Sequence, residues 1–304
     1  MEDSHLFMYS FNMKHAIFRI LKFILFFIAF FSLINLIYLL IIVNTDWDFR
    51  KRMESLKFEL PEFNLLVLGA STTLDGIDTQ HLTGRGIKSY NLALGGSTTK
   101  TNYYQLKEYI DRYATKPEYI IYGINNGMGA PLDDPSIHPI VEFTMENRDL
   151  SLEDMPIMKF KWLGIEFLKK VISVKHRKAD VVLGQLKFEK VIPDETEYKE
   201  NTVDKSDMQS SYWLCKIAKL CENSSIKFII IEMPGYRETQ NMDAGGPISI
   251  KLVDGSLVSY YNFNSREFCQ SFSYTDWIGN SHLNRFGAEK LSAAIFERIF
   301  SENY

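Results

Sequence analysis

An uninterrupted apolar run near the N-terminus constrains this chain more than any other feature of its sequence. The run is "FILFFIAFFSLINLIYLLIIV", Phe23 to Val43, which is 21 residues without a charge. At a rise of about 1.5 Å per residue, a helix of this length spans about 30 Å, the hydrocarbon thickness of a bilayer. Its only polar side chains are Ser32, Asn35 and Tyr38, so it lacks the polar face of an ordinary surface helix. The run therefore predicts a single transmembrane helix.

The residues that flank the run indicate that the helix is kept as an anchor. A signal peptide has a shorter apolar core, about 7–15 residues, followed by a small-residue cleavage site. Here the charged sequence "NTDWDFRKR" follows instead. Basic residues lie on both sides in equal number: Lys14, Arg19 and Lys22 before the run, Arg50, Lys51 and Arg52 after it. The positive-inside rule therefore does not orient the helix.

Composition narrows the classes of protein to consider. The 304 residues are 46% apolar, which is enough for a sizeable core, and the net charge of −4 argues against nucleic acid as the main partner. Cys215, Cys221 and Cys269 lack CxxC spacing and indicate neither a disulfide framework nor a zinc site. One bridge stays open, although ordinary buried cysteines are favoured.

The chain divides into three parts by composition. Residues 1–44 form an N-terminal tail and the anchor, with the membrane span at 23–43, and residues 45–60 form a charged tether. Residues 61–304 form one large domain, interrupted by an insertion at 127–205 that is rich in scattered charges and short apolar runs. Met158–Ile172 predicts an amphipathic helix inside the insertion. The insertion is interpreted as a lid, as a partner surface, or as a structural excursion without a catalytic part.

The large domain alternates apolar strands with helices. Four apolar segments predict strands: Asn64–Leu68, Ser89–Leu94, Pro117–Gly123 and Ile226–Pro234. Helical spacing predicts helices at Thr101–Tyr113, Ser206–Asn223 and Arg285–Phe300. Continuous apolar strands that alternate with helices are typical of an α/β fold, in which helices cover both faces of a parallel sheet.

Glycine-marked polar turns follow three of the predicted strands, where parallel sheets bind ligands. Ser71 follows Gly69, and its hydroxyl is either a nucleophile or the cap of the next helix. Gly95 and Gly96 form either a tight turn or a turn that exposes a backbone N–H. Asn125 is either a turn residue or an amide donor at the same edge.

A fourth block lies near the end of the chain, in "DWIGNSHLNRFGAEKLS", Asp276 to Ser292. Of the six histidines, only His282 lies in a short polar loop that leads into a late amphipathic helix. A lone histidine is usually structural or exposed, so its position relative to the other three blocks decides its interpretation.

Together, the four blocks resemble the SGNH (GDSL-type) hydrolase superfamily, in which a serine, a glycine, an asparagine and a late histidine occur in this order. The resemblance covers roughly residues 63–123 and 226–300. The ending "HLNRFGAEKLS" is similar to membrane-anchored members found beside cell-surface polysaccharide and teichoic-acid genes. The resemblance implies a flavodoxin-like three-layer sandwich with a central parallel sheet, preceded by one transmembrane helix.

The resemblance also implies a role for each block. Ser71 is expected to be the nucleophile and His282 the general base that deprotonates it. The backbone N–H groups of Ser71 and of Gly96 (or Gly95), together with the side-chain amide of Asn125, are expected to form the oxyanion hole. No metal or cofactor is expected.

The sequence departs from the family pattern in two places. Ala70 stands where many members have an aspartate, which does not affect the nucleophile. Gly279 stands three residues before His282, where the family usually has the acid that orients the histidine. Asp276 lies six residues before the histidine and is expected to take that role if the loop folds back. A Ser–His dyad and an inactive protein stay open as alternatives.

The resulting hypothesis is a membrane-anchored serine esterase or O-acyltransferase that acts on acetyl-type acyl groups of an envelope polysaccharide. Its expected partners are an acylated glycan or acyl donor and the membrane, with the large domain on the extracytoplasmic side. The alternative is a catalytically inactive scaffold or partner protein in a polysaccharide assembly complex. Nucleotide binding is disfavoured because "GAST" matches neither G-x-G-x-x-G nor the Walker pattern.

Overall fold

The computed structural model describes two separate units of the chain. The residues described are 3–44, 62–125, 132–138, 141, 157, 164–165, 180–189, 191, 205–236, 247–279 and 282–301. The first unit consists of residues 1–46 with 147–176, and the second of residues 47–146 with 177–304. The predicted tether and most of the predicted insertion lie outside the described residues, so their boundaries stay predictions.

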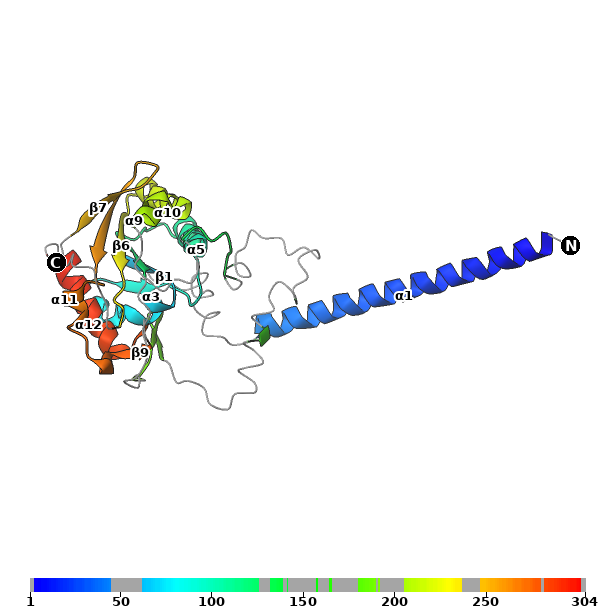
Figure 1. Ribbon diagram of the computed structural model, residues 1–304, viewed down its shortest axis with the longest axis horizontal. Helices are drawn as coiled ribbons and strands as arrows, with labels where there is room; N and C mark the ends of the chain where they lie inside the picture. The colour runs from blue at the N-terminus through cyan, green and yellow to red at the C-terminus, as the bar shows by residue number, and fades with distance from the viewer. Residues whose placement is uncertain are drawn as a thin grey trace. The chain divides into compact units, whose positions relative to one another are not determined.

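The first unit is built on one long helix, α1 (Asp3–Asn44), coloured blue in Figure 1. Its stretch from His15 to Tyr38 is long and apolar enough to cross a membrane. Most of the predicted span, Phe23–Val43, falls in this stretch, and its large apolar side chains are exposed. The helical form of the apolar run is thus confirmed.

Two of the polar side chains of α1 accept hydrogen bonds from the insertion. The side-chain oxygen of Asn35 accepts the backbone N–H of Ile157 at 3.1 Å, and the hydroxyl of Tyr38 accepts that of Gly164 at 3.0 Å. A Cβ at Gly164 would lie 2.6 Å from the same hydroxyl, so this contact requires a glycine. Most of the amphipathic helix predicted at Met158–Ile172 lies outside the described residues.

The second unit contains a six-stranded sheet in the order β2-β1-β3-β6-β8-β7. The strands are β1 (Leu65–Gly69), β2 (Ser89–Asn91), β3 (Tyr119–Ile124), β6 (Lys227–Glu232), β7 (Ile248–Lys251) and β8 (Leu257–Asn262). All neighbouring pairs are parallel except β7 with β8. The predicted α/β class is confirmed, with one correction: the sheet has an antiparallel edge strand.

Helices cover both faces of the sheet (Figure 1). One side carries α5 (Thr99–Arg112) and α10 (Tyr212–Asn223); the other carries α3 (Ser71–Gly76), α4 (Thr79–Gly84) and α12 (Arg285–Ile295), which continues as a π-helical turn. Two successive residues of β3 point to opposite faces of the sheet. The Tyr122 hydroxyl bonds to Thr99 of α5 at 3.0 Å, whereas Ile121 joins the core that packs on α12.

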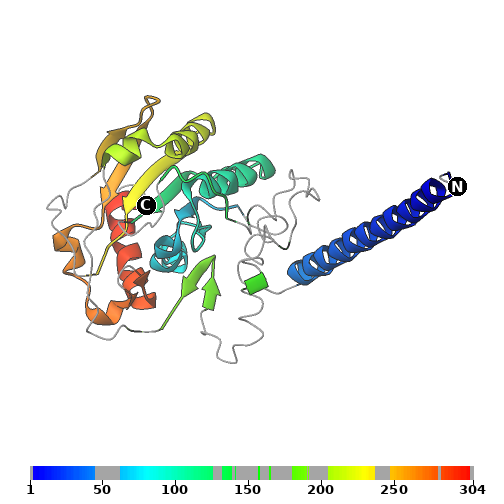
Figure 2. The same cartoon turned by 45° about the vertical axis from the view of Figure 1, so that its right-hand side comes forward.

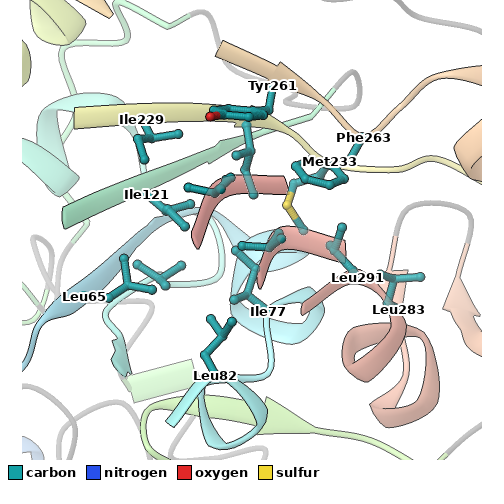
Figure 3. Close-up of a cluster of buried hydrophobic side chains, with 14 of the residues drawn as sticks. Leu65, Ile77, Leu82, Ile121, Ile229, Met233, Tyr261, Phe263, Leu283 and Leu291 are labelled. Carbon is teal, nitrogen blue, oxygen red and sulfur yellow. The ribbon is translucent and has the colours of Figure 1, made fainter. Parts of the chain in front are cut away.

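The core on the α12 side fixes the two segments that carry the serine and the histidine. Figure 3 shows Leu65, Ile121 and Ile229 from the strands meeting side chains from the helices. Leu283, the residue after His282, is only 2% exposed and belongs to the same cluster. Because burying a leucine side chain contributes about 1.5–3 kcal/mol, Leu283 anchors the end of the chain to the sheet.

The three cysteines are ordinary buried thiols, as the sequence favoured. Cys215, Cys221 and Cys269 are all buried, and none of them forms a disulfide within the part of the chain that the structure describes. Burial raises the pKa of the Cys221 thiol to about 12, so that thiol stays protonated and unreactive at neutral pH.

Candidate active site

Ser71 lies at the point where β1 ends and α3 begins. The N-cap of α3 is Ala70, in an extended conformation and without a side-chain capping bond. The Ser71 hydroxyl is therefore not the cap, which was the alternative left open by the sequence. It makes no hydrogen bond to any other residue in the part of the chain that the structure describes. The hydroxyl is left available for chemistry.

Helix α3 lies directly on the ends of two strands. The Thr73 hydroxyl donates a hydrogen bond to the Gly123 carbonyl at 3.2 Å. A Cβ at Gly69 or at Gly123 would lie 2.3 Å or 2.2 Å from that same hydroxyl. Both strands must therefore present a glycine here, and this close approach fixes Ser71 at the edge of the sheet.

Asp75 and His282 form the most informative contact of the site. The Asp75 carboxylate lies 2.7 Å from Nδ1 of His282; its side chain is 7% exposed and the imidazole is 32% exposed. Asp75 lies four residues after Ser71 on α3, so the two side chains share one helix face. A carboxylate at Nδ1 favours the tautomer that carries its proton there and leaves Nε2 as an acceptor. One helical turn thus carries a serine and the acid partner of the histidine.

Asp75 was not predicted from the sequence, because the family pattern places the acid beside the histidine. The available signal was an acidic residue at i+4 from Ser71, on a helix that was expected to begin at the serine. No hydrogen bond joins Ser71 to His282 among the described residues, although α3 packs against the strand that carries the histidine. Such bonds commonly tighten only when substrate is bound.

The carboxylate of Asp276 contacts Ser273 and Lys290, not His282. Its Oδ2 accepts the Ser273 backbone N–H at 2.8 Å in a capping box and lies 2.7 Å from the Lys290 ammonium. The residue is buried at the end of the 3₁₀ turn η2 (Tyr274–Asp276). The interpretation of Asp276 as the acid that orients His282 is therefore corrected: its carboxylate turns back toward its own turn and α12, and Asp75 meets Nδ1 instead.

Gly279 lies directly opposite His282. The two residues pair across a small antiparallel ladder formed by β9 (Trp277–Gly279) and β10 (His282–Leu283). Opposed residues in such a ladder project to the same face, with Cβ atoms about 4.5–5.5 Å apart. Among the described residues, a Cβ at Gly279 would have nothing within 4 Å. The position where the family pattern has an acid is thus beside the imidazole and open.

The glycine turn after β2 is tied to the end of β1. The Leu94 N–H and the Ser97 hydroxyl both donate to the Gly69 carbonyl, at 3.2 Å and 2.6 Å. Gly96 has φ +73° and is exposed, a backbone conformation that side chains rarely adopt. These bonds hold the predicted oxyanion turn next to the start of α3.

Asn125 follows β3 at the same edge. It is 8% exposed, and its amide makes no hydrogen bond to any of the described residues. Because β2, β1 and β3 are neighbours and parallel, the turns after all three strands lie side by side. The sheet topology therefore brings the residues around Ser71, Gly96 and Asn125 to one edge.

A second histidine, His138, lies at the glycine turn and was not predicted. Its imidazole hydrogen-bonds to the backbone of Gly95, and burial lowers the pKa of His138 to about 4, so it is neutral at neutral pH. Its own backbone N–H donates to the Thr101 hydroxyl at 2.8 Å. The described start of the insertion therefore packs on the glycine turn at Gly95.

No protein-family model matches the chain, and no curated protein matches it either. Among solved structures, the chain is similar to a candidate platelet activating factor from Streptococcus pneumoniae, with 10% sequence identity and a TM-score of 0.35. The match covers 82% of this chain and 89% of that one. At this level of similarity, function has to be argued from the site itself.

Proposed function

We propose that the protein is a serine esterase or O-acyltransferase that works through an acyl-serine intermediate. The observation that carries this proposal is the Asp75–His282 pair, whose acid lies one helical turn from Ser71. A serine hydroxyl is a weak nucleophile until a base accepts its proton, and a histidine held by a carboxylate is the commonest such base.

The first half-reaction breaks the acyl–oxygen bond of the substrate. His282 accepts the Ser71 proton at Nε2 while the serine oxygen attacks the acyl carbonyl carbon. The carbonyl electrons move onto oxygen, giving a tetrahedral oxyanion. As the oxyanion collapses, the imidazolium returns the proton to the leaving alcohol, and an acyl-serine ester remains. Asp75 accepts the Nδ1–H throughout and stabilises the imidazolium.

Three donors at the strand edge would stabilise the oxyanion: the backbone N–H groups of Ser71 and Gly96 and the side-chain amide of Asn125. Losing one such donor typically costs about 2.7–4 kcal/mol of transition-state stabilisation. The buried position of Asn125 supports this role, because a preorganised donor acts most strongly where water is excluded.

In the second half-reaction, His282 accepts a proton from water or from an acceptor hydroxyl, whose oxygen attacks the acyl-serine carbonyl carbon. As the second oxyanion collapses, the Ser71–acyl bond breaks and the imidazolium returns the proton to the Ser71 oxygen. Hydrolysis and transfer use the same groups, so the proposal covers both. The N-terminal helix and the family resemblance together favour an acylated envelope glycan as donor or acceptor, with the large domain on the extracytoplasmic side of the membrane.

Ser71→Ala tests the proposal directly. The variant should lose at least about 10³-fold in hydrolysis of an aryl acetate and should no longer be labelled by a fluorophosphonate probe, while its thermal unfolding stays unchanged. Ser271→Ala, which removes an exposed serine outside the strand-end turns, should behave like the wild type and serves as the matched control.

The inactive-scaffold alternative gives the opposite result. A folded wild-type protein that the probe does not label, and that turns over no aryl acetate, would contradict the enzyme and favour a non-catalytic partner in polysaccharide assembly. Labelling that persists at full rate in Ser71→Ala would contradict Ser71 as the nucleophile.

A further inference from the structure

The end of the insertion forms a hairpin that docks on the second unit's sheet. It consists of β4 (Asp180–Val182) and β5 (Gln185–Lys187), shown in green in Figure 2. Leu183 and Gly184 join the strands with φ values of 45° and 83°, the left-handed pair of a two-residue hairpin turn. A Cβ at Gly184 would lie 2.1 Å from the carbonyl oxygen of Asn91, so the turn packs directly on the end of β2.

Hydrogen bonds tie this hairpin to the elements around the site. The Leu183 carbonyl accepts the backbone N–H of Asn91 and the hydroxyl of Thr79, both at 3.0 Å. The Lys187 ammonium lies 2.8 Å from the buried carboxylate of Asp78, which caps α4. These contacts fix the register of the hairpin against β2 and α4.

One hairpin side chain reaches the catalytic helix itself. Gln185 is fully buried, and its Nε2 donates to the backbone carbonyl of Asp75 at 3.1 Å. The Asn91 amide also donates to this helix, to the carbonyls of Thr73 and Leu74 at 3.0 Å and 3.4 Å. The Thr73 carbonyl also accepts the C-cap N–H of Ile77, whereas the carbonyls that follow it lie in the last turn of α3, where helical partners run out. The two amides therefore hold the C-terminal end of α3.

We propose that Gln185 is a positioning residue, which sets the backbone of Asp75 so that its carboxylate meets Nδ1 of His282. This inference rests on the proposed function and gives the end of the insertion a part in catalysis. A helix of six residues is not stable alone, so external bonds determine where α3 lies. Misplacing a catalytic group by about 1 Å can cost about 10²-fold in rate.

A purely structural role for Gln185 predicts something different. Loss of a structural residue lowers stability but leaves the kcat of the folded molecules unchanged. A positioning residue lowers kcat in folded molecules, and it does so only through Asp75. Gln185→Met separates the two, because methionine keeps the shape and volume of the side chain and removes its N–H donor.

The experiment compares Gln185→Met with Val181→Ala, a control on the exposed face of the same hairpin. In Gln185→Met, kcat for an aryl acetate and the rate of fluorophosphonate labelling of Ser71 should fall about 10-fold or more, with KM within about threefold. Val181→Ala should match the wild type. In an Asp75→Asn background, Gln185→Met should cause no further loss, because two residues that act through one contact are not additive.

Unchanged kcat and labelling in folded Gln185→Met would overturn the inference alone, as would a full additional loss in the Asp75→Asn background. A wild-type protein that the probe does not label overturns the proposed function together with the inference. If Gln185→Met does not fold, Gln185→Asn takes its place with the same expected results, because its amide is one methylene too short to reach the Asp75 carbonyl.

Discussion

Two buried aspartates, Asp75 and Asp276, differ in their distance from His282 along the chain and in the groups that their carboxylates contact. Asp75 is 207 residues away along the chain, yet its carboxylate meets Nδ1 of the histidine at 2.7 Å. Asp276 is six residues away and pairs instead with Lys290 and with its own turn. Nearness in sequence thus places an acid in the same loop, while its local hydrogen bonds decide which way the carboxylate points.

The physical difference lies in the elements that carry the two carboxylates. Asp75 projects from a helix fixed on two strand ends by Thr73, Gly69 and Gly123. Asp276 ends a 3₁₀ turn, and a capping box satisfies its Oδ2 within four residues. A carboxylate that closes its own turn is poorly placed to orient another side chain.

Asp75→Asn should give the largest effect on activity. An asparagine keeps the shape but stabilises neither the correct tautomer nor the imidazolium, so kcat should fall about 10³–10⁴-fold. Steady-state kinetics on an aryl acetate measures this. Asp111→Asn, an exposed aspartate on α5, is the control. A fall in kcat of less than about threefold in Asp75→Asn would contradict the role of Asp75 as the acid partner, because His282 would then work without it.

Gly279→Asp should restore part of the kcat that Asp75→Asn loses. The position faces His282 across the β9–β10 ladder and has room for a side chain. In the Asp75→Asn background, the new carboxylate should recover about 10-fold or more in kcat; Gly279→Asn, which adds shape without charge, should recover none. Equal rates for the two double variants would show that position 279 does not reach the imidazole.

Asp276→Asn should affect stability more than catalysis. Removing the charge weakens the pair with Lys290 and the capping box, and a loss of about 1–3 kcal/mol in the free energy of unfolding is expected. Lys290 is half-exposed, so solvent screens the pair, and Lys290→Met should lose less than about 1 kcal/mol. Chemical denaturation gives both values, and kcat should stay within about threefold. A collapse of kcat in folded Asp276→Asn would return the orienting role to this residue.

Much of the fold could be predicted because apolar runs mark buried strands directly. The segments around Leu65, Ile120 and Ile229 are apolar on both faces, as a covered parallel strand requires. β7, at the edge of the sheet, lacks this signal, and β8, which lies between β6 and β7, shows it only in part. β7 reads exposed–exposed–buried–exposed, and β8 begins with an exposed leucine. An edge strand exposed on one side resembles a loop in sequence.

The meeting of the three turns at one edge of the sheet could be predicted, because each turn follows a parallel strand. The meeting of two distant segments could not be predicted. Ser71, Gly96 and Asn125 each follow a strand, so the order of the strands was enough to bring their turns together. The pairing of Asp75 with His282 depends on how Leu283 packs into the core, and the i+4 spacing of Asp75 from Ser71 does not by itself predict that packing. Two further residues, His138 and Gln185, were not predicted, because the sequence of the insertion is irregular.

The spacing of Ser71, Asp75 and His282 along the chain determines the order in which the proposed site is assembled during synthesis. Ser71 and Asp75 are translated together, whereas the imidazole enters only after a further 207 residues have been made. Closing a loop of that length costs about 5 kcal/mol of chain entropy beyond a constant, which burial of the α12 core must offset. If the proposed function holds, a growing chain carries its serine and acid early but becomes reactive only when the helix α12 docks.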